Sequence, residues 1–152
     1  MGIVPQDPFL FDASIMENVR YSRHGASDED VVEACKAAAI HEKILTYADG
    51  YQTRVIEHGI KLSKGEIQQI AIARVLLQNP KIVLLEEPTS CMESQTESLV
   101  QLALQQLGNG RTTFTVAHKY VSFLHHFQCS HLHLLTRFID GLPSSIRMSS
   151  SS

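Results

Sequence analysis

Two adjacent carboxylates at the end of an apolar run are the first residues in this sequence that suggest chemistry. The apolar residues 82–85 are followed directly by Glu86 and Glu87. Such a run is typical of a buried parallel strand, and catalysts built on parallel sheets place their groups at the carboxyl ends of strands. One carboxylate there can hold Mg²⁺, while the next orients or deprotonates a water molecule. Taken alone, the pair is better explained as a strand that runs into a solvated acidic turn.

Three further features along the chain suggest a phosphate and a metal. Residues 63–66, Ser-Lys-Gly-Glu, fit the capping box that opens a helix, and a helix start with free N–H groups and a hydroxyl also attracts phosphate. His118 ends a second β-rich run and can donate a hydrogen bond to a phosphate, although a single histidine at a strand end is usually structural. Gln6, after a first short strand, offers an amide to a metal or to water.

Hydrophobic spacing and turn residues predict the elements that position these groups. Strands are expected within residues 3–12, 81–85, 112–117 and 132–138, and helices over residues 15–21, 28–39, 41–48, 64–78 and 94–107. A helix-rich first part followed by strand, helix and strand predicts an α/β fold with a helical subdomain.

Composition excludes several classes of protein. The chain has 152 residues, 43% of them hydrophobic, which fits one globular domain and not a disordered chain. A formal net charge of -3 argues against a dedicated nucleic-acid binder. No apolar run approaches the ~20 residues that cross a bilayer. Neither a signal peptide nor a disulfide framework is expected, because the start is not basic and the three cysteines are far apart.

Taken together, the ordered motifs resemble the nucleotide-binding domain of an ATP-binding cassette (ABC) transporter of the exporter type. Residues 4–11 resemble the Q-loop with Gln6 as its glutamine, 62–66 the signature motif (LSKGE where LSGGQ is common), 82–87 the Walker B strand, 90–93 the D-loop, and His118 the H-loop. The resemblance implies a partial RecA-like ABC core: a Q-loop strand and turn (1–13), a helical subdomain with the signature motif (14–78), a RecA-like half (79–140) and a disordered tail (141–152).

The resemblance also implies roles for individual residues. Gln6 and Glu86 would contact Mg²⁺, and Glu87 would polarise the hydrolytic water. His118 would contact the γ-phosphate of ATP bound by its own subunit. The signature residues Ser63, Lys64, Gly65 and Glu66 would form the site for ATP held by the opposite subunit.

The family implies partners and a location as well. The expected partners are a second nucleotide-binding domain and transmembrane domains, with no nucleic acid. The expected place is the cytosolic face of a membrane, such as that of the vacuole or the mitochondrion, reached only through the parent transporter.

The sequence also departs from the family pattern. No G-x-x-x-x-G-K-[ST] occurs, so the Walker A loop is missing and the chain is expected to be the C-terminal portion of a domain, or a degenerate copy. Glu86 stands where Asp is usual, and Lys64 where Gly is usual. We therefore expect no ATP turnover by the isolated chain, poor solubility and a partly molten state. The alternative is a non-catalytic interaction module. A DNA-repair ATPase of the same superfamily is less favoured, because the segment between Gln6 and Ser63 is too short for coiled-coil arms.

A histidine-rich stretch near the end contains metal-competent side chains: His125, His126, Cys129, His131 and His133. Their spacing matches no known zinc pattern, so a divergent terminus is the favoured explanation and a metal site the lesser one.

Overall fold

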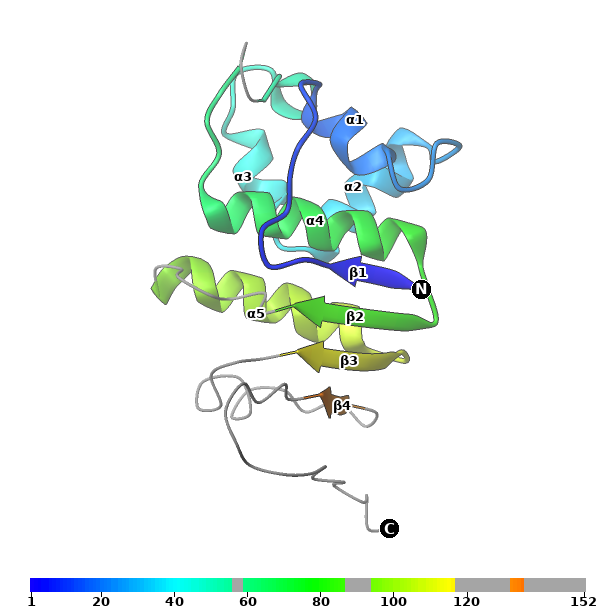
Figure 1. The fold of residues 1–152 in the computed structure, drawn as a ribbon. Coiled ribbons are helices and arrows are strands. Elements are labelled where there is room, and N and C mark those ends of the chain that lie inside the picture. Colours follow the sequence, from blue (N-terminus) through cyan, green and yellow to red (C-terminus); the bar gives the residue numbers. More distant parts are fainter. Residues whose placement is uncertain (56–58, 87–93, 117–131, 136–152) are drawn as a thin grey trace.

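The computed structural model describes residues 1–55, 59–86, 94–116 and 132–135, and it has the predicted α/β architecture (Figure 1). In chain order the elements are β1 (Gly2–Val4), α1 (Ile15–Arg20), α2 (Asp28–Ala37), α3 (His41–Leu45), the 3₁₀ turn η1 (Gly50–Gln52), α4 (Lys64–Gln78), β2 (Ile82–Glu86), α5 (Ser94–Gly108), β3 (Thr112–Val116) and β4 (Leu132–Leu135). Each predicted strand and helix has a counterpart among the described residues, although the first strand already ends at Val4 and residues 117 and 136–138 of the predicted strands lie outside the described ones. The third helix is shorter than predicted. The chain leaves α3 at Thr46, and the 3₁₀ turn η1 follows before Thr53.

The four strands form one parallel sheet in the order β1-β2-β3-β4. Val4 lies beside Leu85, and Glu86 lies beside Val116, so the strands stay in step to their ends. Because all strands run the same way, their carboxyl ends meet at one edge of the sheet. The segments that follow β1, β2 and β3 therefore start from the same place.

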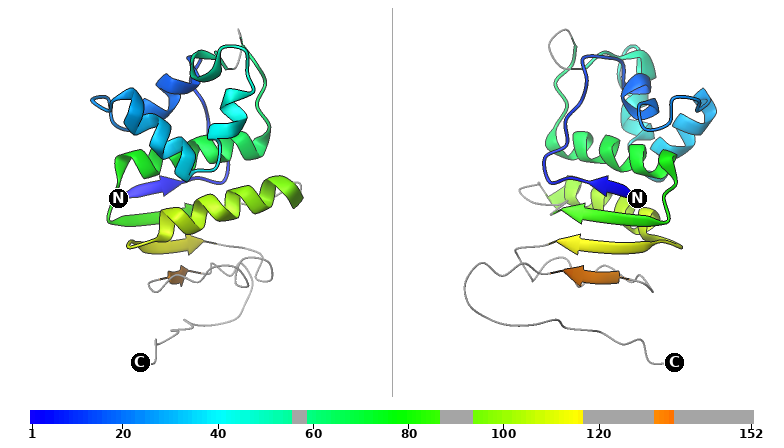
Figure 2. Two further views of the ribbon diagram at one scale, coloured as in Figure 1. Left: turned by 180° about the vertical axis from the view of Figure 1, so that it is seen from behind. Right: turned by 45° about the vertical axis from the view of Figure 1, so that its right-hand side comes forward.

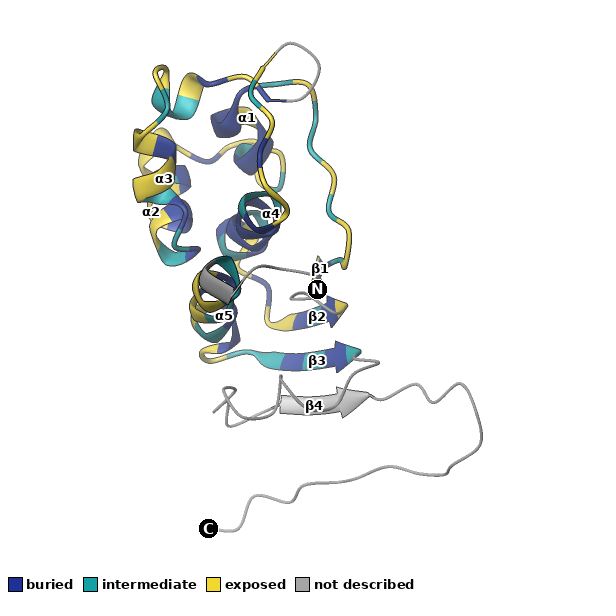
Figure 3. Cartoon of the chain, turned by 90° about the vertical axis from the view of Figure 1, so that its left-hand side faces the viewer, coloured by how far each residue is buried: buried dark blue, intermediate teal, exposed yellow. Residues whose placement is uncertain are grey.

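Helices cover the sheet unevenly. Helix α5 lies against one face, while α4 runs beside β1, as the views from behind and from the side show (Figures 2 and 3). Val83 and Leu85 point to the covered face and are buried. On the opposite face no described helix lies over the strands, and there Ile3 and Ile82 remain 47% and 42% exposed.

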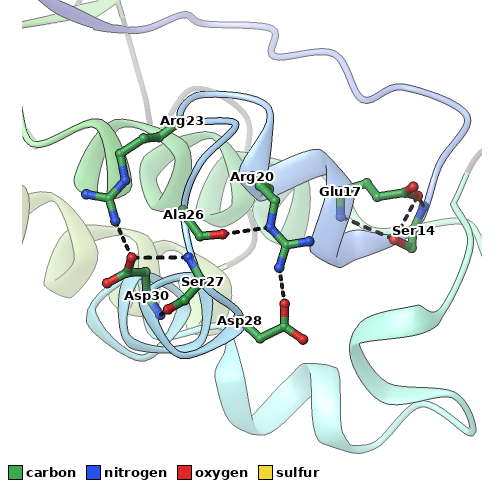
Figure 4. A network of polar contacts seen from close by, with 8 residues as sticks. All are labelled: Ser14, Glu17, Arg20, Arg23, Ala26, Ser27, Asp28 and Asp30. Atoms are coloured by element: carbon green, nitrogen blue, oxygen red, sulfur yellow. Dashed lines mark hydrogen bonds and ion pairs between the residues drawn. The ribbon is translucent and has the colours of Figure 1, made fainter.

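The helical part packs around α4 and starts its main helices in the same way. Ser14, Ser27 and Ser63 each form a complete capping box with the acidic residue three positions later, as the sequence predicts for Ser63. Arginines and aspartates add a surface network around the second of these caps (Figure 4). The capping boxes satisfy backbone N–H groups that a helix start otherwise leaves free.

Candidate functional site

The carboxyl edge of the sheet carries two of the predicted site residues within the described chain. Glu86 ends β2, and Gln6 lies two residues after the end of β1; both are exposed. Among the described residues, none forms an ion pair with the Glu86 carboxylate. Glu87 and His118, which the sequence predicts at the same edge, lie outside the described residues.

Side chains from α4 hold the segment that contains Gln6. Gln68 is almost completely buried and donates from Nε2 to the carbonyl oxygen of Pro5 at 3.1 Å. Farther along α4, Arg74 donates to the carbonyl oxygens of Phe9 at 2.8 Å and of Asn18 at 2.7 Å. The backbone on both sides of Gln6 is therefore tied to the helix that begins at Ser63.

The amino end of α4 presents a hydroxyl and free backbone donors. The Ser63 hydroxyl oxygen accepts from the Glu66 N–H at 3.3 Å, and the Glu66 carboxylate accepts from the Ser63 N–H at 2.7 Å. The Ser63 hydroxyl also donates to the Glu66 carboxylate, and this hydrogen bond helps to lower the pKa of that group. The N–H groups of Lys64 and Gly65 belong to the first turn and have no helical partner. This arrangement can bind an anion such as phosphate.

Gly65 fixes where this helix end lies. It is buried, and a Cβ atom at this position would come within 1.7 Å of Thr96 Cγ2 on α5. Since α5 follows β2, this close approach puts the Ser63 end of α4 on the same side of the molecule as the carboxyl ends of the strands (Figure 1).

Two residues near Glu66 were missed by the sequence analysis. The Tyr47 hydroxyl donates to Glu66 Oε1 at 3.2 Å, and Lys43 Nζ lies 3.5 Å from the same oxygen. Burial acts to raise the pKa of Glu66, but the hydrogen bonds from Ser63, the charge of Lys43 and the Tyr47 hydroxyl outweigh it and lower that pKa. Burial and the neighbouring Glu66 raise the pKa of Tyr47, so its hydroxyl stays a donor. The contact spans 19 residues of sequence, and no local spacing signals it.

The structure gives no metal cluster among the residues it describes, since nowhere in them do three His, Cys, Asp or Glu side chains gather. The histidine-rich stretch that the sequence singles out lies outside these residues, apart from the backbone of His133 in β4. A search of the same described residues also finds no helix with the length and apolar character needed to cross a membrane.

A parallel sheet with helices packed beside it defines the α/β class of proteins, in which ligands bind at the carboxyl ends of the strands. The sequence profile of the family described as "ABC transporter" matches residues 1–90. The chain is 49% identical over 119 residues to the ABC transporter aclQ of Aspergillus oryzae, with 78% of this chain and 15% of that protein covered. The chain belongs to the ABC transporter family.

Relatives from animals show the same likeness. Heavy metal tolerance factor 1 of Caenorhabditis elegans is 50% identical over 119 residues, and ATP-binding cassette sub-family B member 6 of Xenopus tropicalis is 49% identical over the same length. Each alignment covers 78% of this chain, but only 15% and 14% of those relatives. The match confirms the family, and the chain corresponds to part of its ATP-binding cassette. It spans about 15% of the length of the curated relatives that it matches.

Proposed function

We propose that the chain serves as the signature-bearing part of an ATP-binding cassette in an exporter-type transporter, where ATP binding and hydrolysis drive solute export. Its partners are a second nucleotide-binding domain and the transmembrane domains of the transporter. It works at the cytosolic face of a membrane, such as that of an organelle, and reaches that membrane through those domains.

The observation that carries this proposal is the geometry at the amino end of α4. The Ser63 hydroxyl accepts the bond that caps the helix and lies beside the first-turn N–H groups, which have no helical partner. In the family, this end closes over the γ-phosphate of ATP held by the other subunit. Exposure of Ser63 supports contact with a partner.

The edge of the sheet would serve the nucleotide of the chain's own subunit. Gln6 and Glu86 supply an amide oxygen and a carboxylate oxygen, ligands of the kind that Mg²⁺ takes together with water. Glu87 would orient the hydrolytic water and His118 would contact the γ-phosphate. Glu86 is one methylene longer than the usual Asp, which moves its carboxylate by roughly an ångström and would disturb the metal geometry.

Nucleotide-dependent association tests the proposal. The full chain is titrated with the ATP-binding cassette of the Xenopus tropicalis relative, with and without Mg²⁺ and the non-hydrolysable analogue AMP-PNP. We expect association only with the nucleotide present. Ser63→Asp keeps the helix cap but removes the hydroxyl donor and adds a negative charge, so this variant should lose association.

Ser27→Asp is the matched control, because it makes the same change at the cap of α2. It should associate as the unmodified chain does. Association that does not need the nucleotide, or that survives Ser63→Asp, would contradict the proposal.

A second candidate function is a non-catalytic interaction module that keeps the cassette surface. It is favoured by one observation, the absence of G-x-x-x-x-G-K-[ST] from the 152 residues. It predicts binding to a cassette that is equally strong with and without AMP-PNP, so the same titration separates the two candidates.

A further inference from the structure

Glu66 poses an electrostatic problem at the amino end of α4. Its carboxylate lies in the first turn of α4, where the proposed function puts a phosphate. A carboxylate and a phosphate that lie close together repel each other, because both are negatively charged. The common form of the motif, LSGGQ, has an uncharged glutamine at this position. The hydrogen bond from the Ser63 N–H orients the carboxylate but leaves its negative charge in place.

Two side chains next to Glu66 compensate its negative charge. Lys43 Nζ lies 3.5 Å from Glu66 Oε1, and the Tyr47 hydroxyl donates to the same oxygen at 3.2 Å. The other oxygen, Oε2, accepts from Ser63 at 2.7 Å. Both oxygens of the carboxylate are thus engaged, and the side chain is only 15% exposed.

The cation is itself held in place. Lys43 Nζ lies 5.4 Å from the centre of the Tyr47 ring, within the range of a cation–π contact. Tyr47 therefore contacts both members of the ion pair. Lys61 and Lys64, the cations next to Ser63 in sequence, are exposed, and no contact joins either to Glu66 among the described residues.

We propose that Lys43 is a positioning residue for the phosphate-binding end of α4. Lys43 neutralises Glu66 and, with Tyr47, keeps its carboxylate in the cap, so that the Ser63 hydroxyl and the first-turn N–H groups meet the γ-phosphate without an uncompensated negative charge beside them. This inference rests on the proposed function and adds a residue outside the signature motif. It predicts that a cation is needed at position 43 only while position 66 carries a carboxylate.

A double-mutant cycle tests this dependence, using the full chain and the AMP-PNP-loaded Xenopus tropicalis cassette with Mg²⁺. Lys43→Met should weaken association about three- to fivefold, the range expected for one partly exposed ion pair. Glu66→Gln keeps the capping box, because glutamine also serves at that position. In the Glu66→Gln background, Lys43→Met should have no effect on affinity.

A purely structural role for Lys43 gives a different result. If Lys43 only packs on Tyr47, its replacement weakens association equally in the unmodified chain and in the Glu66→Gln background, and that outcome overturns the inference. Lys36→Met is the matched control, since Lys36 is as exposed as Lys43 and pairs with Glu33 on α2. It should leave affinity unchanged.

Failure of the inference and failure of the proposed function are distinguishable. If Ser63→Asp abolishes association while Lys43→Met leaves it intact, the inference is wrong and the function stands. If the unmodified chain shows no nucleotide-dependent association, the proposed function fails and the inference fails with it. Thermal unfolding followed by circular dichroism shows whether each variant keeps its fold.

Discussion

The helical part of the molecule and its sheet differ in how far their polar groups and apolar side chains are covered. In the helical part, α1, α2 and α4 each begin at a serine with a complete capping box, and large side chains such as Ile15, Ile44 and Ile70 are buried around α4. In the sheet, α5 covers one face, while Ile3 and Ile82 stay exposed on the other face of the described strands.

The difference lies in how far the described residues cover the apolar side chains of each part. Parallel sheets normally have both faces covered, because their crossover helices pack on each side. The helical part satisfies its polar ends and its apolar stripe within these residues. On the other face of the described strands, apolar side chains such as Ile3 and Ile82 stay exposed. Four predictions probe this contrast.

The largest expected effect concerns Arg74, which ties the helical part together. Arg74→Met removes donors to Phe9 and Asn18 and leaves the carbonyl oxygen of the buried Asn18 without this partner. We expect a loss of about 2–4 kcal/mol in the free energy of unfolding, measured by urea denaturation. Arg23→Met, which removes an exposed pair with Asp30, should cost less than about 1 kcal/mol. Equal losses for the two variants would contradict the contrast between buried and exposed contacts.

The second effect lies where α4 meets α5. Gly65→Ala puts a methyl group into the space of the Thr96 side chain and should destabilise the fold by about 1–3 kcal/mol. Thr96→Ala removes the clashing Cγ2 atom. The double variant should therefore recover most of the loss in the same denaturation measurement, and no recovery would show that the contact is misplaced.

The third effect is a pH dependence from the helix cap. The pKa of Glu66 is lower in the folded chain than the ordinary value of 4.5, so its contribution to stability is present above that pH and fades as the pH falls below it. Glu66→Gln should flatten this part of the curve of unfolding free energy against pH. An unchanged slope between the two chains would show that Glu66 is not held by its cap.

The smallest expected effect on stability belongs to the uncovered face. Ile82→Thr changes an exposed side chain and should shift the free energy of unfolding by no more than about 0.5 kcal/mol, while lowering self-association and the binding of an apolar dye. Val83→Thr, the neighbour on the covered face, buries a hydroxyl and should cost about 1–3 kcal/mol. Similar costs for the two variants would show that both faces are covered.

Local patterns explain why so much of this fold could be predicted. The strand at 82–86 and the caps at Ser27 and Ser63 follow from hydrophobic runs and from residues three positions apart. Contacts between distant residues escaped prediction for the same reason. Arg74 reaches Phe9 across 65 residues of sequence, and Tyr47 reaches Glu66 across 19, and only the packing of the helices brings these pairs together.

The most direct test of the account measures whether the chain alone hydrolyses ATP. Phosphoryl transfer depends on a cradle for the β- and γ-phosphates, and the sequence contains no G-x-x-x-x-G-K-[ST] to form one. ATP turnover is measured for the purified full chain and for its Glu87→Gln variant, with Mg²⁺. We predict no turnover above background in either. Robust turnover that disappears in Glu87→Gln would contradict the account, because it would show a complete phosphate site within this chain.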